Sequence, residues 1–108
     1  GIELQEDVAK GAHDLVEQEK TKDFKGTIIV GDSRTANIED RLHYFGIDKV
    51  HFIIYHPPYW DIIKFSDNEK DLSNCNSLEE FNQSFGEVID NTSKCLEKNR
   101  YCACKISN

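Results

Sequence analysis

The sequence predicts an α/β fold in which mostly parallel strands alternate with helices. Short runs rich in β-branched and aromatic residues occur at 27–30, 49–55 and 101–106. Between them lie segments whose apolar residues recur every three or four positions, which is the spacing of an amphipathic helix. Strands that alternate with helices in this way form parallel sheets with right-handed crossovers.

The composition predicts a single small domain. Its 108 residues are 38% hydrophobic and 31% charged, which is enough for one modest core. No run approaches the roughly 20 apolar residues of a membrane span, so we expect no membrane partner. The net charge of −7 gives no overall basic patch, so DNA contacts would have to come from regions outside this chain.

The cysteines predict reduced thiols in a cytoplasmic protein. Cys75 and Cys95 are isolated in the sequence, and Cys95 falls on the apolar face of a predicted helix. Cys102 and Cys104 point to the same face of a predicted strand, and such close neighbours rarely form a disulfide. The spacing of cysteines and histidines matches no zinc motif, so we expect no metal.

The N-terminal region predicts a peripheral amphipathic helix over residues 2–20. A charged connector at residues 21–26 follows it and ends in glycine. We therefore expect residues 1–26 to be an N-terminal helix with its connector, and residues 27–108 to be the main α/β region. The run at 27–30 lies between glycines and predicts a buried strand.

The next elements carry clear start and stop signals. Residues 31–34 predict a turn, and a helix is expected over 38–45 with Gly46 at its end. The continuous apolar run at 49–55 predicts a strand buried on both faces, as in a parallel sheet.

The second half begins with a predicted loop over residues 61–76. Residues 77–80, Ser-Leu-Glu-Glu, match a capping box and open a helix that we expect to end at Asn99. A final strand is expected over 101–106.

The most informative segment is His56-Pro57-Pro58-Tyr59-Trp60, directly after the second strand. Its prolines are the only two in the chain, and proline cannot donate to a sheet ladder. They end the strand and stiffen the backbone at the carboxyl end, where α/β sheets bind ligands. Fixed acceptors beside an aromatic ring suit a planar heterocycle with an exocyclic amine. The residues alone leave a purely structural Pro-Pro turn equally open.

Residues 56–66 resemble motif IV of the S-adenosylmethionine-dependent amino-methyltransferases, which methylate adenine N6 or cytosine N4 in DNA. That motif is (Asp/Asn/Ser)-Pro-Pro-(Tyr/Phe/Trp). Residues 31–34, Gly-Asp-Ser-Arg, resemble the Gly-Asp-x-x segment that often precedes it, and residues 71–74, Asp-Leu-Ser-Asn, also follow the family's order. The resemblance covers residues 27–108. It implies part of a Rossmann-like methyltransferase sheet and a site-specific DNA methyltransferase of the restriction-modification type.

The resemblance also implies roles for single residues. His56 and the Pro57 carbonyl would accept hydrogen bonds from the target amine, with Pro58 completing the catalytic motif. Tyr59 would stack on the flipped base, with Trp60 beside it in the substrate site. Positioning would supply most of the catalysis.

The methyl donor implied by the resemblance is S-adenosylmethionine, with Asp32 as its contact in this chain. The family's Phe-x-Gly-x-Gly segment is absent from the six glycines, and the chain begins at Gly1 and has no methionine. We therefore expect an N-terminal fragment of a permuted enzyme, inactive alone. His56 stands where Asp, Asn or Ser is usual, and only its neutral form accepts a hydrogen bond.

Two other functions stay open at this point. The chain would serve either as a non-catalytic interaction module with a methyltransferase-like fold, or as a methyltransferase of a protein or RNA amine. The sequence also leaves open the target base, the recognition sequence and whether the protein is a homo-oligomer.

Overall fold

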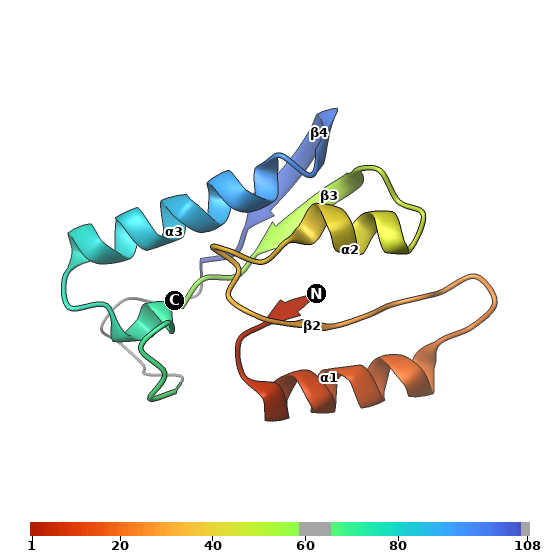
Figure 1. Ribbon diagram of the computed structural model, residues 1–108, viewed down its shortest axis with the longest axis horizontal. Coiled ribbons are helices and arrows are strands. Elements are labelled where there is room, and N and C mark those ends of the chain that lie inside the picture. The colour runs from red at the N-terminus through yellow and green to blue at the C-terminus, as the bar shows by residue number, and fades with distance from the viewer. Residues whose placement is uncertain (59–65, 107–108) are drawn as a thin grey trace. The chain divides into compact units, whose positions relative to one another are not determined.

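The computed structural model describes residues 1–58 and 66–106. The chain divides into two compact units, Gly1–Ser33 and Arg34–Asn108, and each contains its own pair of parallel strands (Figure 1). The elements are β1 (Ile2–Glu3), α1 (Glu6–Glu19), β2 (Ile29–Val30), α2 (Ile38–Tyr44), β3 (Val50–Tyr55), the 3₁₀-helix η1 (Leu72–Asn74), α3 (Leu78–Ser93) and β4 (Leu96–Cys104). The predicted alternation of parallel strands with helices is confirmed. In the described residues the strands form two separate two-stranded sheets.

The first unit corrects the prediction of one helix over residues 2–20. Ile2 and Glu3 form β1, which pairs in parallel with Ile29 and Val30. The Gly1 carbonyl accepts from Ile29 N at 2.8 Å, so these backbone groups bond to a neighbouring strand instead of a helical turn. The expectation of a buried strand at 27–30 is also wrong in part, because Val30 is 50% exposed.

Helix α2 matches its prediction closely. Asn37 caps it by accepting a hydrogen bond from Asp40 N at 3.2 Å. At the other end Gly46 has a φ of +74°, its N–H donates to the His43 carbonyl at 2.9 Å, and Ile47 N donates to the Leu42 carbonyl at 2.8 Å. This pair of bonds is the pattern by which a left-handed glycine ends a helix.

Strands β3 and β4 are parallel neighbours in the second unit (Figure 1). Their register pairs Phe52 with Tyr101 and Tyr55 with Cys104, after an irregularity next to Val50. The prediction that Asn99 ends the preceding helix is wrong, because α3 ends at Ser93 and Asn99 lies within β4 with a φ of +64°. Asparagine tolerates this left-handed conformation, and here it serves the irregular part of the ladder.

The predicted burial of β3 on both faces is wrong. Tyr55 is buried, whereas Phe52 is 53% and Ile54 67% exposed. Phe52 and Ile54 share one face because residues two apart in a strand point the same way. Tyr101, opposite Phe52 in the register, is 79% exposed. We call Phe52, Ile54 and Tyr101 the open face.

Helix α3 begins with the predicted capping box in a modified form. The Ser77 side chain accepts a hydrogen bond from Glu80 N at 3.1 Å, as expected. The Glu80 carboxylate accepts from Asn76 N at 2.8 Å, one residue further back than the usual partner. Cys95, just after the helix, is buried as predicted. No helix in residues 1–58 and 66–106 is long and apolar enough to cross a membrane.

Candidate functional site

The candidate site begins where β3 ends. His56, Pro57 and Pro58 follow Tyr55 and have no regular secondary structure, so the prolines end the strand as predicted. The structure leaves His56 exposed and half-buries both prolines. Tyr59 and Trp60, the predicted base contacts, lie outside the described residues.

Tyr55 fixes the end of the strand from several directions. Its hydroxyl lies 2.6 Å from Thr92 Oγ1, and its ring packs edge-on against Phe85 with centroids 6.0 Å apart. Thr92 Oγ1 donates to the Val88 carbonyl at 2.8 Å, so the Tyr55 hydroxyl is the donor to Thr92. The Tyr55 carbonyl also accepts from Lys105 N at 2.8 Å. We call Tyr55, Phe85 and Thr92 the strand-end anchor.

A second anchor lies at Ser66, where the chain continues after residues 59–65. The Ser66 hydroxyl donates to Asp71 Oδ2 at 2.7 Å, and Ser73 donates to Asp71 Oδ1 from its backbone N at 2.9 Å and its hydroxyl at 2.7 Å. Asn74 Nδ2 donates to the Ser66 carbonyl at 2.7 Å. Asp71 and Ser73 are both buried. We call Ser66, Asp71, Ser73 and Asn74 the return network.

The return network holds a charged carboxylate. Burial acts to raise the pKa of Asp71, but the hydrogen bonds from Ser73 and Ser66 outweigh it, so that the pKa lies below its usual range. Hydrogen bonds to a carboxylate are shorter and about twice as strong as those between neutral groups. The sequence placed residues 71–74 in the family pattern and gave them no role. An Asp followed two residues later by Ser is the signal that would have found this turn.

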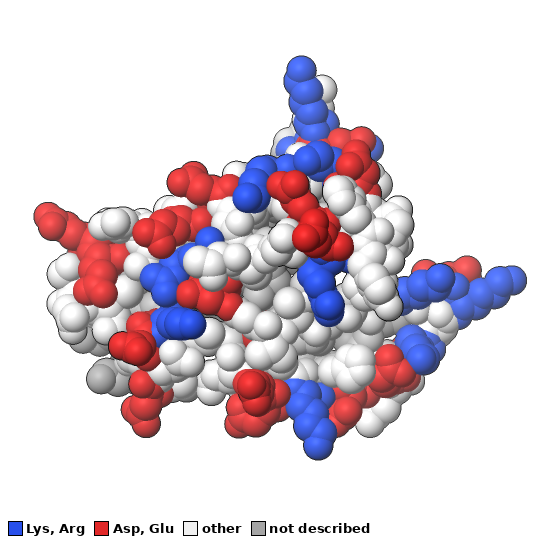
Figure 2. All heavy atoms as spheres, in the orientation of Figure 1, with Lys and Arg blue, Asp and Glu red and all other residues white. Residues whose placement is uncertain are grey.

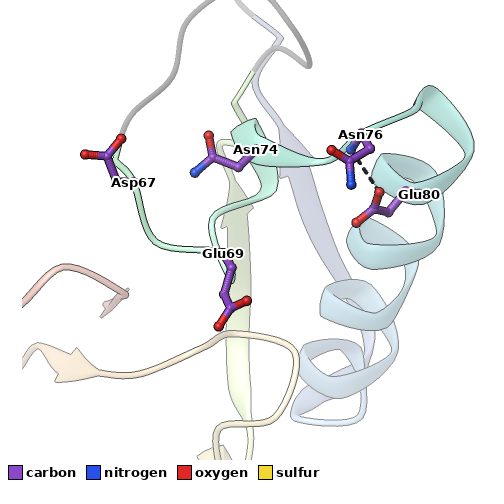
Figure 3. Close-up of a pocket in the computed structure, with 5 residues that line it drawn as sticks. All are labelled: Asp67, Glu69, Asn74, Asn76 and Glu80. Atoms are coloured by element: carbon purple, nitrogen blue, oxygen red, sulfur yellow. Dashed lines mark hydrogen bonds between the residues drawn. The ribbon is translucent and has the colours of Figure 1, made fainter.

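A polar hollow of about 400 Å³ lies beside the network (Figure 3). Its lining comes from the turn after Ser66, from η1, from the link between η1 and α3, and from the first turn of α3. It consists of Asp67, Glu69, Asn74, Asn76 and Glu80. No group of three or more His, Cys, Asp or Glu side chains among the described residues is arranged to hold a metal ion.

Asp32 lies in the turn between β2 and α2, within the unit Gly1–Ser33. His56, Pro57 and Pro58 belong to the other unit, Arg34–Asn108. The contact of Asp32 with a methyl donor therefore stays a prediction.

The described glycines do not fit a methyl-donor cradle. A Cβ at Gly11, Gly46 or Gly86 would meet nothing within 4 Å, and Gly26 packs against Val16 of its own unit. These four glycines are also far apart in the sequence, so they form no Gly-x-Gly loop of the kind that binds a cofactor.

Comparison with known proteins gives no match to a protein-family model, a curated protein or a solved structure. The functional assignment rests on the residues themselves.

Proposed function

We propose that this chain supplies the target-amine side of an S-adenosylmethionine-dependent methyltransferase that acts on adenine N6 or cytosine N4 in DNA. The observation that carries the proposal is the position of His56-Pro57-Pro58 directly after buried Tyr55, at the carboxyl end of a parallel strand. Ligands of open α/β sheets bind outside the carboxyl ends of the strands. In this proposal β3 and β4 are neighbouring strands of a Rossmann-like sheet.

The proposed chemistry of this chain is orientation of the amine. The Pro57 carbonyl and neutral His56 accept the two hydrogens of the amine, while Tyr59 stacks on the base and Trp60 lies beside it. Proline fixes its own φ and restricts the residue before it, so these acceptors keep their directions when the amine arrives. Such positioning is a large part of catalysis in group transfer. Asp32 is the only donor contact that we assign to this chain.

In this proposal the DNA phosphate contacts come from other parts of the enzyme. On the face shown in Figure 2, acidic side chains lie between the basic ones, so the described residues form no continuous basic patch there. The net charge is −7. Phosphate contacts need clustered Lys and Arg. We place the reaction in the cytoplasm, where the four thiols of this chain would stay reduced.

The open face favours a second candidate, a non-catalytic interaction module. Phe52, Ile54 and Tyr101 expose apolar surface that a partner would cover. A module of this kind needs the fold of the second unit and makes no use of Tyr59. Substitution of Tyr59 therefore separates the two candidates.

Mass spectrometry of DNA tests the proposal. The protein, as produced from its own gene, is expressed in cells whose DNA lacks N6-methyladenine and N4-methylcytosine, and the DNA nucleosides are then quantified. We expect one of the two methylated bases, its loss in Tyr59→Ala, and its retention in the control Tyr44→Ala, which removes an exposed tyrosine of α2.

Two results would overturn the proposal. The first is DNA without either methylated base when the native protein is present. The second is an equal level of methylation in native protein and Tyr59→Ala. Methylated RNA or protein amines in place of DNA bases would overturn the substrate class.

A further inference from the structure

Strand β4 has one edge that no other described strand covers. Among the described residues, β4 pairs with β3 alone. The Lys105 N–H donates to the Tyr55 carbonyl at 2.8 Å, and Cys104 is the residue in register with Tyr55. In this parallel pattern the backbone N–H and C=O of Cys104 face away from β3, and by alternation so do those of Cys102. The backbone groups of both cysteines therefore point to the free edge.

The last part of this edge lacks the features that keep edge strands from pairing with other chains. Those features are charged side chains, prolines and bulges. The first half of β4 has them in Lys98, the left-handed Asn99 and Arg100. Residues 101–104, Tyr-Cys-Ala-Cys, carry no charge and are all exposed. An edge of this kind is a template for another strand.

Helix α3 leaves the outer side of β4 accessible. It packs on β3, where Phe85 and Thr92 contact Tyr55. Cys104, which is in register with Tyr55, remains exposed, and so does Cys102. The opposite side of the sheet is the open face. A strand that approaches the free edge of β4 therefore meets neither α3 nor a covered surface.

We propose that the occupant of this edge is β4 of a second copy of the chain, paired antiparallel about a twofold axis at Ala103. In an antiparallel pair, residues whose backbone groups point to the shared edge stand opposite each other. Cys102 of each copy then stands opposite the partner's Cys104. This register pairs residues 101–105 with the same residues of the second copy, and it stays clear of Asn99.

The side chains of this register are complementary. Tyr101 and Lys105 share one face of β4 because they lie four positions apart. Each Tyr101 ring stands opposite the partner's Lys105 ammonium, a pair that attracts by a cation–π interaction. Arg100 stands opposite the partner's Ile106, so no like charges meet. Ala103 has a small side chain at the axis, where two larger ones would meet. The charges and sizes thus favour a second copy in this register.

The proposed interface is small, so the dimer should depend on concentration. Stable complexes bury about 20–30 residues a side, far more than one short strand supplies. Sedimentation equilibrium of the native protein with a reducing agent, from about 10 μM to about 1 mM, measures the association. We expect monomers at the low end and dimers at the high end.

Two substitutions at one residue test the edge itself. Cys104→Pro removes an outward N–H that the ladder to β3 does not use, and it should weaken dimerisation at least about tenfold. The control Cys104→Ser keeps that N–H and should dimerise like the native protein. If Cys104→Pro does not fold, Ala103→Lys replaces it. Ala103 is exposed, and two lysines at the axis should repel each other and keep the protein monomeric.

A mixture of two cysteine variants tests the register. Opposite residues of antiparallel strands have Cα atoms about 4.5–5.5 Å apart, within the range of a disulfide. Cys102→Ser and Cys104→Ser are oxidised with diamide, which takes up the two hydrogen atoms of each thiol pair. Peptide mass spectrometry then counts the disulfides between two β4 segments. We expect many more in the mixture than in either variant alone, because only the mixture places a thiol opposite a thiol.

Three results would overturn the inference. The first is a monomer at every concentration. The second is equal dimerisation of the native protein and a folded Cys104→Pro or Ala103→Lys. The third is an equal yield of β4 disulfides in the mixture and in the separate variants. The inference makes no use of Tyr59. A monomeric protein that methylates DNA would therefore overturn the dimer and leave the proposed function intact, and a dimer without methylation would do the reverse.

Discussion

The strand-end anchor and the return network are held together by different physical means. The strand-end anchor joins Tyr55 to Thr92, which are 37 positions apart in the sequence, through ring packing and a bond between neutral hydroxyls. The return network lies within residues 66–74 and depends on one charged carboxylate. The first anchor therefore needs the fold of the whole second unit, and the second needs only a local turn. We expect the first to respond to packing and the second to pH.

Truncation of the strand-end anchor should have the largest effect. Tyr55→Ala removes a buried ring that packs on Phe85, and such a change costs about 3–5 kcal/mol of unfolding free energy. Tyr55→Phe removes only the donor to Thr92 and should cost about 1 kcal/mol. Urea unfolding measures both values. A Tyr55→Phe variant as stable as the native protein would show that the hydroxyl pair contributes nothing.

Loss of the Asp71 carboxylate should cause the next largest decrease in the free energy of unfolding. Asp71→Ala removes the carboxylate that accepts from the buried backbone N and hydroxyl of Ser73 and should cost about 2–3 kcal/mol of unfolding free energy. The matched control Asp67→Ala removes an exposed carboxylate nearby and should stay within about 0.5 kcal/mol of the native protein. Equal losses in both variants, measured by urea unfolding, would contradict the buried network.

The pH dependence should separate the two anchors. The pKa of Asp71 is lower in the folded protein than its usual value, so its stabilisation is present above the usual carboxyl pKa. It is lost as the pH falls through the lowered folded value. The stability difference between the native protein and Asp71→Asn should therefore shrink as the pH falls from 7 to 3.

The difference between the native protein and Tyr55→Phe should stay constant over the same pH range, because its hydrogen bond joins two neutral hydroxyls. Urea unfolding at both pH values measures the two differences. If both stability differences changed with pH in the same way, the distinction between the two anchors would be contradicted.

A pair of glycine substitutions, one in α3 and one at the end of α2, should change stability in opposite directions and leave the return network unchanged. Gly86 lies inside α3 with nothing near its Cβ position, so Gly86→Ala should stabilise the protein by about 0.5–1 kcal/mol. Gly46 is equally open but has a φ of +74°, so Gly46→Ala should destabilise it by about 1 kcal/mol. Thermal unfolding measures both signs, and equal signs would contradict the backbone assignments.

The smallest effect concerns thiol reactivity. Burial, reinforced by the Glu39 carboxylate, raises the pKa of Cys95 beside the strand-end anchor, whereas Cys102 and Cys104 are exposed. A thiol reagent at pH 8 should label Cys102 and Cys104 first and Cys95 only on unfolding, because the thiolate is the reactive form. Peptide mass spectrometry follows the order, and early labelling of Cys95 would contradict its burial.

Local signals predicted much of the fold. The turn glycine Gly46 marked the end of α2 and the capping residue Ser77 marked the start of α3, because each acts within a few residues. Strand β1 was missed because two residues carry no periodicity, and only pairing with β2 makes them a strand. The exposure of Phe52 and Ile54 was missed because an apolar run does not reveal which faces are covered.

In the candidate site, too, features that depend on nearby residues were easier to predict than features that depend on packing. The prolines after β3 were visible in the sequence because proline has a fixed local effect. The hydrogen bond between Tyr55 and Thr92 was not visible in the sequence, since it depends on how α3 packs on the strand. The Ser66 bond to Asp71 is local, yet composition alone suggested only a loop.

The most direct test of the central claim is a titration of the chain with single-base oligodeoxynucleotides, followed by the fluorescence of Trp60. Adenine and cytosine carry an exocyclic amine and thymine does not, although all three stack on aromatic rings. We predict that oligodeoxyadenylate or oligodeoxycytidylate binds about tenfold more tightly than oligothymidylate, as one hydrogen-bonded amine would give, and that Tyr59→Ala binds all three weakly. Equal affinity of the native chain for all three oligonucleotides would contradict the claim that Pro57-Pro58-Tyr59 binds a planar amine.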